Sequence, residues 1–230
     1  MNSNGIHLDH CTWKAAKFAC ENWHYSRTAP PSKSFKVGVW EQGRFIGAVI
    51  FGRGSNNRIG QPLGLVQTEI CELNRVALRE HAAPVSKIVA TAIRIFKREF
   101  PGMKAIISYA DPEQGHHGGI YQAMGWVYIG TSHAQREMIL EGREVHKRTV
   151  SSRFGTVSPE RIRAANPAIN IRYGPIRFKH CYALPLCPSV AAKLAPIRKP
   201  YPKRAGSIDN DAPAIQRDEG GAIPTPALHS

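Results

Sequence analysis

The stretch SYADPEQGHHGGIYQAMGW, residues 108–126, decides the fold. It completes the apolar run KAIISYA, residues 104–110, which is typical of a buried central strand. The strand is expected to end at Asp111-Pro112, because proline cannot donate to a strand ladder. A glycine-rich turn follows, with a short helix over about 116–124 and a return to strand over 126–129. This order predicts a sheet with a helix packed on it.

The surrounding chain supplies further strands and helices. Apolar residues at helical spacing favour a helix over 11–23 and a longer one between Pro84 and Pro101-Gly102. Runs of β-branched and aromatic residues predict hairpins around Glu41–Arg44 and around Glu141-Gly142. The other expected elements are a loop over 52–64, a helix that starts at Ser158-Pro159, and strands over 35–40, 45–51, 69–78 and 176–184. Together they predict an α/β (α+β) fold, with a mixed central sheet flanked by helices.

The end of the chain differs in composition from the rest. Residues 1–190 are predicted to form one domain, which includes a basic C-terminal extension. Residues 191–230 are rich in Pro, Gly, Asp and Ala, and we expect a mostly disordered tail, basic up to Arg204 and acidic after it. The sequence has no run near the ~18 apolar residues of a membrane span and no charged-then-apolar leader. An integral membrane protein is therefore excluded, and a secreted one is disfavoured.

Charge is the most informative feature of the composition. The 31 Lys and Arg residues against 17 Asp and Glu give a formal net charge of +14. The excess is concentrated in residues 141–205, which hold 14 basic and 3 acidic residues. Because each Lys or Arg near a nucleic-acid backbone releases a condensed counterion, we expect a nucleic-acid partner. Five cysteines without a CxxC pair favour a reducing cytosol over a disulfide framework or a zinc ribbon.

Several side chains are candidates for chemistry, and each also has a structural interpretation. Asp111 stands at the carboxyl end of a predicted central strand, where ligand sites of α/β sheets lie, but it can equally form an Asx turn. His24-Tyr25 follows a predicted helix and could simply close it. Tyr121 could be a core aromatic residue on a short helix. His116-His117 does not favour a chelating pair, because adjacent residues on a helix point in different directions.

The order of elements resembles the GNAT acyltransferase fold. The segment Tyr121-Gln-Ala-Met-Gly125-Trp126 is similar to the Tyr-x-x-x-Gly-aromatic ending of that fold's helix, and ELNRVAL, residues 72–78, stands where the family has its other central strand. The stretch REHAAPVSK, residues 79–87, departs from the pattern. It lacks the glycines of the turn whose N–H groups cradle the pyrophosphate of acyl-CoA, and it contains a proline. The resemblance implies a GNAT-like catalytic domain over 1–190 with an altered donor site.

A closer resemblance covers roughly residues 10–185. The stretches WHYSRTAPPSKSFKVGVWEQGRFIGAVIFGRG (23–54), ELNRVAL (72–78) and YADPEQGHHGGIYQAMGW (109–126) are similar to the Mom DNA-modification proteins of transposable phages. This resemblance implies an enzyme of the host cytoplasm that places a carbamoylmethyl (glycinamide) group on N6 of adenine in phage DNA and so protects it from host restriction. The family's catalytic positions correspond to His24, Tyr25, Asp111 and Tyr121, and Arg75 and Ser86 are the expected donor contacts.

The carbamoylmethyl product implied by this resemblance suggests which molecule donates the added group. Glycyl transfer to N6, followed by attack of the glycyl amine on ring C6, gives the glycinamide group without oxidation. We therefore expect a glycyl donor in the form of glycyl-tRNA, with acyl-CoA as the alternative. Iron is compatible with the family if His24 and Asp111 converge, although a 2-His-1-carboxylate site would need a second histidine. The metal content stays open.

The expected partners are double-stranded DNA and charged tRNA, with no membrane. The basic residues predicted to contact nucleic acid are Arg27, Lys33, Arg53, Arg198, Lys199, Lys203 and Arg204. Two alternative functions remain open. One is an acyl-CoA-dependent GNAT N-acetyltransferase, and the other is a nucleic-acid-binding protein without enzymatic activity.

Overall fold

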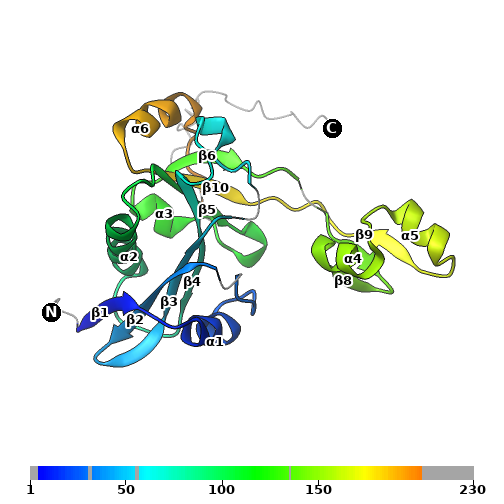
Figure 1. The fold of residues 1–230 in the computed structure, drawn as a ribbon, viewed down its shortest axis with the longest axis horizontal. Helices are drawn as coiled ribbons and strands as arrows, with labels where there is room; N and C mark the ends of the chain where they lie inside the picture. The colour runs from blue at the N-terminus through cyan, green and yellow to red at the C-terminus, as the bar shows by residue number, and fades with distance from the viewer. Residues whose placement is uncertain (1–4, 31–32, 55–56, 135, 204–230) are drawn as a thin grey trace, which may run out of the picture.

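The structure, a computed structural model, describes residues 5–30, 33–54, 57–134 and 136–203. Figure 1 shows a body built around one large sheet and a smaller lobe that projects from one side of it. We call this smaller lobe, residues 132–179, the arm. Among the residues described, none of the helices combines the length and the apolar character needed to cross a bilayer.

The body is organised around a seven-stranded mixed sheet. Its strands, in chain order, are β1 (Ile6–His10), β2 (Phe35–Glu41), β3 (Arg44–Gly52), β4 (Ile70–Leu78), β5 (Ala105–Ala110), β6 (Val127–Thr131) and β10 (His180–Pro185). They lie in the order β1-β2-β3-β4-β5-β10-β6, and β4 and β5 form the parallel pair in an otherwise antiparallel sheet. The predicted mixed sheet is confirmed.

The parallel pair is where the sheet opens. Pairing of β4 with β5 covers Ile70–Glu72 against Ala105–Ile107, although β4 continues to Leu78 and β5 to Ala110. The two strands therefore diverge toward their carboxyl ends. Because β10 pairs with the other edge of β5, the opening lies between two well-supported halves of one sheet.

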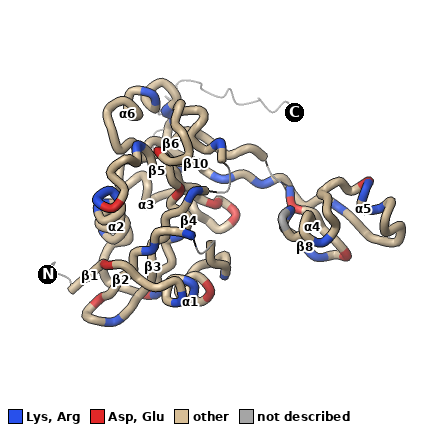
Figure 2. Tube along the Cα trace, viewed as in Figure 1, with Lys and Arg blue, Asp and Glu red and all other residues tan. Residues whose placement is uncertain are grey.

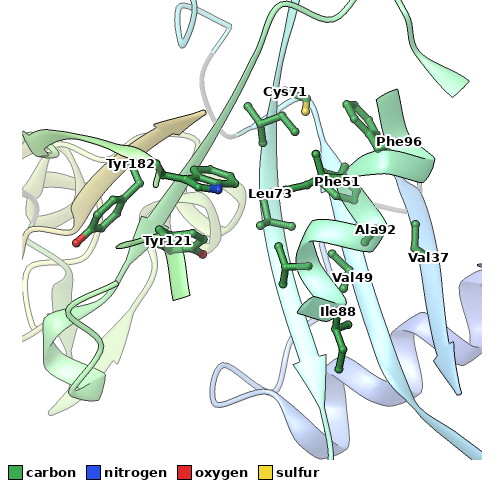
Figure 3. Packing of buried hydrophobic residues seen from close by; sticks show 14 of the residues in the cluster. Val37, Val49, Phe51, Cys71, Leu73, Ile88, Ala92, Phe96, Tyr121 and Tyr182 are labelled. Atoms are coloured by element: carbon green, nitrogen blue, oxygen red, sulfur yellow. The ribbon is translucent and has the colours of Figure 1, made fainter. Parts of the chain in front are cut away.

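Two helices, α1 (Trp13–Trp23) and α2 (Val85–Glu99), cover opposite faces of this sheet. The sequence of β3, RFIGAVIFG, is apolar at nearly every position because the strand is buried on both faces. Ala48 and Ile50 belong to the cluster with α1, whereas Val49 and Phe51 belong to the cluster with α2. The ring of Phe51 stacks on Phe96 of α2, with 4.6 Å between ring centroids (Figure 3).

The helix in the stretch that follows β5 is shorter than predicted. A 3-10 turn covers Pro112–Gln114, and α3 spans Gly119–Ala123 rather than 116–124. The cause is Gly118, which adopts a left-handed backbone with φ of +87° and so ends helical geometry on its N-terminal side. A Cβ at this position would collide with the ring of Tyr182, so glycine is required there.

The arm has a fold and a core of its own. Its strands are β7 (Met138–Leu140), β8 (Arg143–Val145) and β9 (Ile171–Tyr173), in the order β8-β7-β9, and its helices are α4 (Lys147–Phe154) and α5 (Pro159–Ala165). Its hydrophobic core cluster consists of five buried residues: Met138, Leu140, Val150, Ile162 and Ile171. The predicted hairpin around Glu141-Gly142 is confirmed, although it is shorter than 134–149 because α4 begins at Lys147.

The C-terminal part of the body is more ordered than predicted. Helix α6 spans Pro188–Leu194 and buries Val190 and Leu194, so the boundary expected between residues 190 and 191 falls inside a helix. The segment beyond it is also held, because the Tyr201 hydroxyl donates to the Trp126 carbonyl at 2.7 Å. The rest of the expected tail, from Arg204 to Ser230, lies outside the described residues.

Other predictions from the sequence have clear outcomes. The helix over 11–23, the first hairpin, the strand over 69–78 and the helix start at Ser158-Pro159 are confirmed. The predicted loop over 52–64 contains a 3-10 turn at Gln61–Leu63. The last strand begins at His180 instead of 176, because the preceding residues leave the sheet to reach the arm. Strand β1 was not predicted.

Candidate active site

A cleft of about 2370 Å³ opens where β4 and β5 diverge. Its lining includes the segment after α1, the loop after β3, the second half of β4, the turn after β5, the start of α3 and residues at the entry to the arm. The four predicted catalytic residues, His24, Tyr25, Asp111 and Tyr121, all line this cleft. The fold therefore gathers side chains from three separate parts of the chain.

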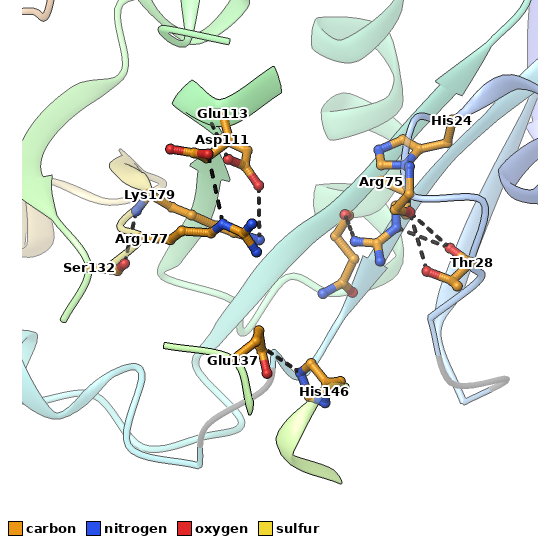
Figure 4. A network of polar contacts seen from close by, with 12 residues as sticks. His24, Thr28, Arg75, Asp111, Glu113, Ser132, Glu137, His146, Arg177 and Lys179 are labelled. Atoms are coloured by element: carbon orange, nitrogen blue, oxygen red, sulfur yellow. Dashed lines mark hydrogen bonds and ion pairs between the residues drawn. The ribbon is translucent and has the colours of Figure 1, made fainter. Parts of the chain in front are cut away.

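Asp111 is placed by the end of β5. One carboxylate oxygen, Oδ1, accepts from the backbone N–H of Glu113 at 3.1 Å and caps the 3-10 turn. The other oxygen, Oδ2, lies 3.7 Å from Nζ of Lys179 (Figure 4). The Asx-turn interpretation and the functional one are thus both compatible with the geometry, because different oxygens serve them. Lys179 was not predicted as a site residue, and it comes from the segment that leads into β10.

His24 follows α1 in an extended backbone conformation. Its Nδ1 accepts from the backbone N–H of Ser26 at 3.1 Å and lies 2.8 Å from the Ser26 hydroxyl. Since Nδ1 is an acceptor, the proton of the neutral ring is on Nε2. Burial, together with the charge of Arg75 and the nearby His116 and Lys179, lowers the pKa of His24 from 6.5 to about 4. At neutral pH His24 is therefore an uncharged hydrogen-bond donor through Nε2.

Tyr25 is the most accessible of the four residues. Its ring lies 4.2 Å from the ring of His24 and 5.5 Å from that of His116, measured between centroids. Partial burial and the charge of Asp111 raise the pKa of Tyr25, and Arg75 opposes the shift. The phenol is therefore protonated at neutral pH. Tyr25 is 44% exposed and lines the cleft, so the residue is accessible to a substrate.

Tyr121 is buried and its hydroxyl proton is already engaged. The Ser108 hydroxyl donates to the carbonyl of Leu73 at 2.8 Å, and it lies 2.7 Å from the Tyr121 hydroxyl. A serine has one hydroxyl proton, so Tyr121 must be the donor in the second bond. Burial raises the pKa of Tyr121 to about 12. This chain of hydrogen bonds joins β4, β5 and α3 at the point where the sheet opens.

The two expected donor contacts differ in their position. Arg75 of β4 lines the cleft, and it donates to the carbonyl of Thr28 at 3.3 Å and to that of Asn74 at 2.7 Å. It therefore fixes the segment that carries His24 against the sheet (Figure 4). Ser86 lies in the first turn of α2, half-buried, and does not belong to the described lining of the cleft.

The predicted nucleic-acid contacts fall into three groups. Lys33 and Arg53 line the cleft. Arg27 instead donates to the carbonyls of Glu21 and Asn22, so it closes the end of α1. The third group lies on the C-terminal segment that packs along β6 and is absent from the described cleft lining: Arg198, Lys199 and Lys203. Arg204 lies outside the described residues.

The iron alternative finds no ligand set in the described part of the chain. No three His, Cys, Asp or Glu side chains there come together in a way that could hold a metal ion. His24 and Asp111 line the same cleft, but no second histidine of the described residues joins them in a ligand set, and both oxygens of Asp111 already have partners in Glu113 and Lys179. The residues therefore do not fit a 2-His-1-carboxylate site, and we route no step of the chemistry through a metal.

Sequence comparisons identify relatives along most of the chain. A model of the Mom protein family matches residues 5–203. The protein named Methylcarbamoylase mom, from Escherichia phage Mu, is 25% identical over 142 residues. That match covers 60% of this chain and 58% of the phage Mu protein, so the chain matches less than two thirds of that relative's length.

Solved structures with a similar arrangement are named as acetyltransferases. One, from Salmonella typhimurium with its cofactor acetyl-CoA, has a TM-score of 0.47 and 9% identity, and the match covers 80% of this chain and 96% of the other. Another, of the GNAT family from Streptococcus pneumoniae, has a TM-score of 0.44 and 11% identity, with 79% and 99% covered.

Proposed function

The chain belongs to the Mom protein family, and from this premise we propose that it is a DNA-modifying transferase acting in the host cytoplasm. Its product would be adenine that carries a carbamoylmethyl group on N6, which protects phage DNA from host restriction. One observation carries the proposal: Asp111 lies at the open end of the central sheet, in a cleft that also contains a neutral His24 and a protonated Tyr25.

The acceptor must leave the duplex before it can react. Adenine N6 lies inside the base stack, so an enzyme that modifies it turns the base out into a pocket, at a cost of a few kcal/mol. In our proposal the flipped adenine places N6 beside Asp111, which accepts a proton from N6 as the carbonyl carbon of the donor is attacked. A positioned general base contributes roughly 10²–10⁴ in rate.

Asp111 would accept a proton, whereas Tyr25 and His24 are suited to donate one or to donate a hydrogen bond. The Tyr25 phenol would donate its proton to the leaving ester oxygen, and the Nε2–H of His24 would donate a hydrogen bond to the carbonyl oxygen. Tyr121 is less suited to act as the acid, because its proton is engaged by Ser108. We assign Tyr121 a positioning role at the divergence of β4 and β5.

The proposed donor is glycyl-tRNA, and the atoms balance for it. Attack of N6 on the glycyl ester forms an N6–CO bond, breaks the ester C–O bond and releases the tRNA hydroxyl. The glycyl amine then attacks ring C6 to close a five-membered ring. Cleavage of the original C6–N6 bond leaves the glycyl nitrogen on C6 and makes the former N6 the terminal amide. No oxidant is needed, and the net addition is C2H3NO.

A carboxylate of the chain supports this donor over acyl-CoA. Oxygens of Glu41 accept from the backbone N–H of Ala82 at 3.1 and 3.2 Å and from that of Ala83 at 3.1 Å. These consecutive N–H groups precede α2, and His81 and Val85 on either side line the cleft. Successive backbone amides can hold an anion. Here the anion is the Glu41 carboxylate, so the Ala82 and Ala83 amides are not available to a donor pyrophosphate.

The test is nucleoside mass spectrometry of DNA from cells that express the protein. A fraction of deoxyadenosine should gain C2H3NO, and fragmentation should show the nitrogen of [15N]glycine attached to ring C6. In vitro, glycyl-tRNA should support the reaction and acetyl-CoA should not. An acetylated product would favour the acyl-CoA-dependent N-acetyltransferase. Unmodified nucleosides from folded protein that still binds DNA would favour the non-enzymatic alternative.

A further inference from the structure

The link between the arm and the body has two chemically different faces. Residues 174–179 connect β9 to β10. Arg177 and Lys179 turn toward the catalytic turn, where Nε of Arg177 lies 3.8 Å from Glu113 and Nζ of Lys179 lies 3.7 Å from Asp111. The residues between and before them, Ile176 and Phe178, are exposed to solvent. We call residues 174–179 the return link.

The contacts of the return link alternate as they do in a strand, where residues i and i+2 share a face. The return link is also held in place, because Lys179 exchanges hydrogen bonds with Ser132 at 2.8 and 3.0 Å. Ile176 is 57% exposed and Phe178 is 43% exposed, with one edge of its ring against His180. Two large apolar side chains are thus exposed on a segment that also carries the ion-pair partner of Asp111.

The arm, which the return link joins to the body, carries an excess of positive charge. Residues 132–179 hold ten Lys and Arg residues and four Asp and Glu residues. Exposed basic residues lie on α4, on α5 and on the strands of the arm (Figure 2): Arg143, Lys147, Arg153, Arg161, Arg163 and Arg172. A basic lobe whose connecting segment exposes apolar side chains matches the chemistry of nucleic acid, whose phosphates are anionic and whose bases are apolar on their faces.

We propose that the arm is the duplex-DNA docking module of this protein, and that Ile176 and Phe178 enter the base stack next to the flipped adenine. The inference rests on the proposed function. Duplex DNA is favoured over tRNA because the return link is tied to Asp111, the residue assigned to the DNA base. A flipped base leaves a gap, and apolar side chains inserted between base steps are a known means of holding a duplex open.

The first experiment tests whether the basic residues of the arm bind duplex DNA. It measures binding of a DNA duplex to the full-length chain by fluorescence anisotropy. The triple variant Arg143→Glu/Lys147→Glu/Arg161→Glu should weaken duplex binding at least tenfold, and the slope of log K against log salt should become shallower by about 0.9 for each phosphate that is no longer neutralised. The matched control, Lys87→Glu/Arg94→Glu on exposed positions of α2, should change binding less than threefold. Equally weakened binding in both variants would overturn the assignment of the arm.

The second experiment tests whether Ile176 and Phe178 enter the base stack. It uses a duplex with the fluorescent base 2-aminopurine at the target position. Ile176→Ser/Phe178→Ser should abolish the fluorescence rise that reports base flipping and reduce modification of duplex DNA at least tenfold. Modification of single-stranded DNA should stay within threefold of wild type, because no base stack has to be opened. Phe100→Ser, at the far end of α2 and also exposed, is the control.

Three outcomes separate the inference from the proposed function. Arm-dependent duplex binding without any adenine modification would leave the docking inference standing and overturn the transferase proposal. Loss of tRNA binding with intact duplex binding in the arm variants would overturn the inference and assign the arm to RNA. Equal loss of single-strand and duplex modification in the Ile176→Ser/Phe178→Ser variant would overturn the role of these side chains in opening the duplex.

Discussion

The body and the arm are built on different principles. The body buries a continuous core on both faces of its sheet, in which aromatic rings such as Phe51 and Phe96 stack. The arm has a core of five buried side chains, two short helices and three strands of three residues each. The two regions are joined by segments that run side by side next to Asp111. A region with a large core and a region with a small core thus meet at the candidate site.

The contrast between body and arm matches the two tasks we propose, which are catalysis in the body and DNA docking by the arm. Catalytic groups need fixed geometry, and Tyr121, Ser108 and Leu73 hold the opening of the central sheet in place by a chain of hydrogen bonds. A docking surface can tolerate movement, and small regions with few buried side chains open more readily than the rest of a protein. The arm is therefore expected to be the less stable of the two regions. Substitutions in each region can test this division.

The strongest test of the body as the seat of the chemistry is Asp111→Asn. Asparagine keeps an oxygen to accept from the Glu113 N–H but cannot take up the proton of N6. We expect modification of adenine to fall by roughly 10²–10⁴, with the melting temperature nearly unchanged. The matched control is Glu113→Gln on the same turn, which should retain activity within threefold. Nearly full activity in Asp111→Asn would move the chemistry away from this turn.

Two core truncations compare the stabilities of the regions directly. Phe96→Ala should reduce the free energy of unfolding of the body by about 3–5 kcal/mol, because it removes a ring stacked on Phe51. Ile162→Ala should destabilise the arm by about 2–5 kcal/mol. Hydrogen exchange followed by mass spectrometry should show that the second change releases protection in 138–173 alone. Loss of protection throughout both regions would mean that they unfold as one unit.

The pH dependence of stability should identify His24 as a partly buried neutral group of the body. Its pKa in the folded chain is about 4, below the usual 6.5, so the unfolded chain binds more protons between these values. The free energy of unfolding should therefore fall as the pH drops from 6.5 to 4, by about 1–2 kcal/mol after allowance for partial exposure. Denaturant melts of wild type and His24→Asn measure this difference. Parallel curves for the two proteins would contradict the shifted pKa.

The smallest expected effect concerns the ion pairs between the regions. Arg177 pairs with Glu113 of the body and with Glu144 of the arm, and all three side chains are partly exposed. Because such ion pairs contribute about 0–1 kcal/mol, Arg177→Gln should hardly change the melting temperature. Hydrogen exchange in 174–179 should nevertheless become faster. A drop of several degrees in melting temperature would show that the arm and the body are coupled more tightly than we infer.

Much of the fold could be predicted because local patterns carried it. The turn Glu41–Arg44 between two apolar runs identified a hairpin, and the apolar stripe after Pro84 identified α2. Asp111 could be selected as a candidate because a strand end followed by proline is visible in the sequence. Strand β1 and helix α6 were missed because each is short and half-exposed, so neither shows a clear periodic spacing of apolar residues. These elements are stabilised by partners that are distant in sequence.

What the sequence alone determined is the class of fold, the position of most elements and the identity of four residues that do share one cleft. Only the tertiary structure decided the protonation states of these residues and the side chains that lie next to them. Lys179 meets Asp111 because β10 lies between β5 and β6, and Glu41 fills the amides of Ala82 and Ala83 because a hairpin end meets the start of a helix. Periodicity reports which face of an element is apolar, whereas the charge and hydrogen-bonding partner of a side chain depend on strand order, which no local pattern specifies.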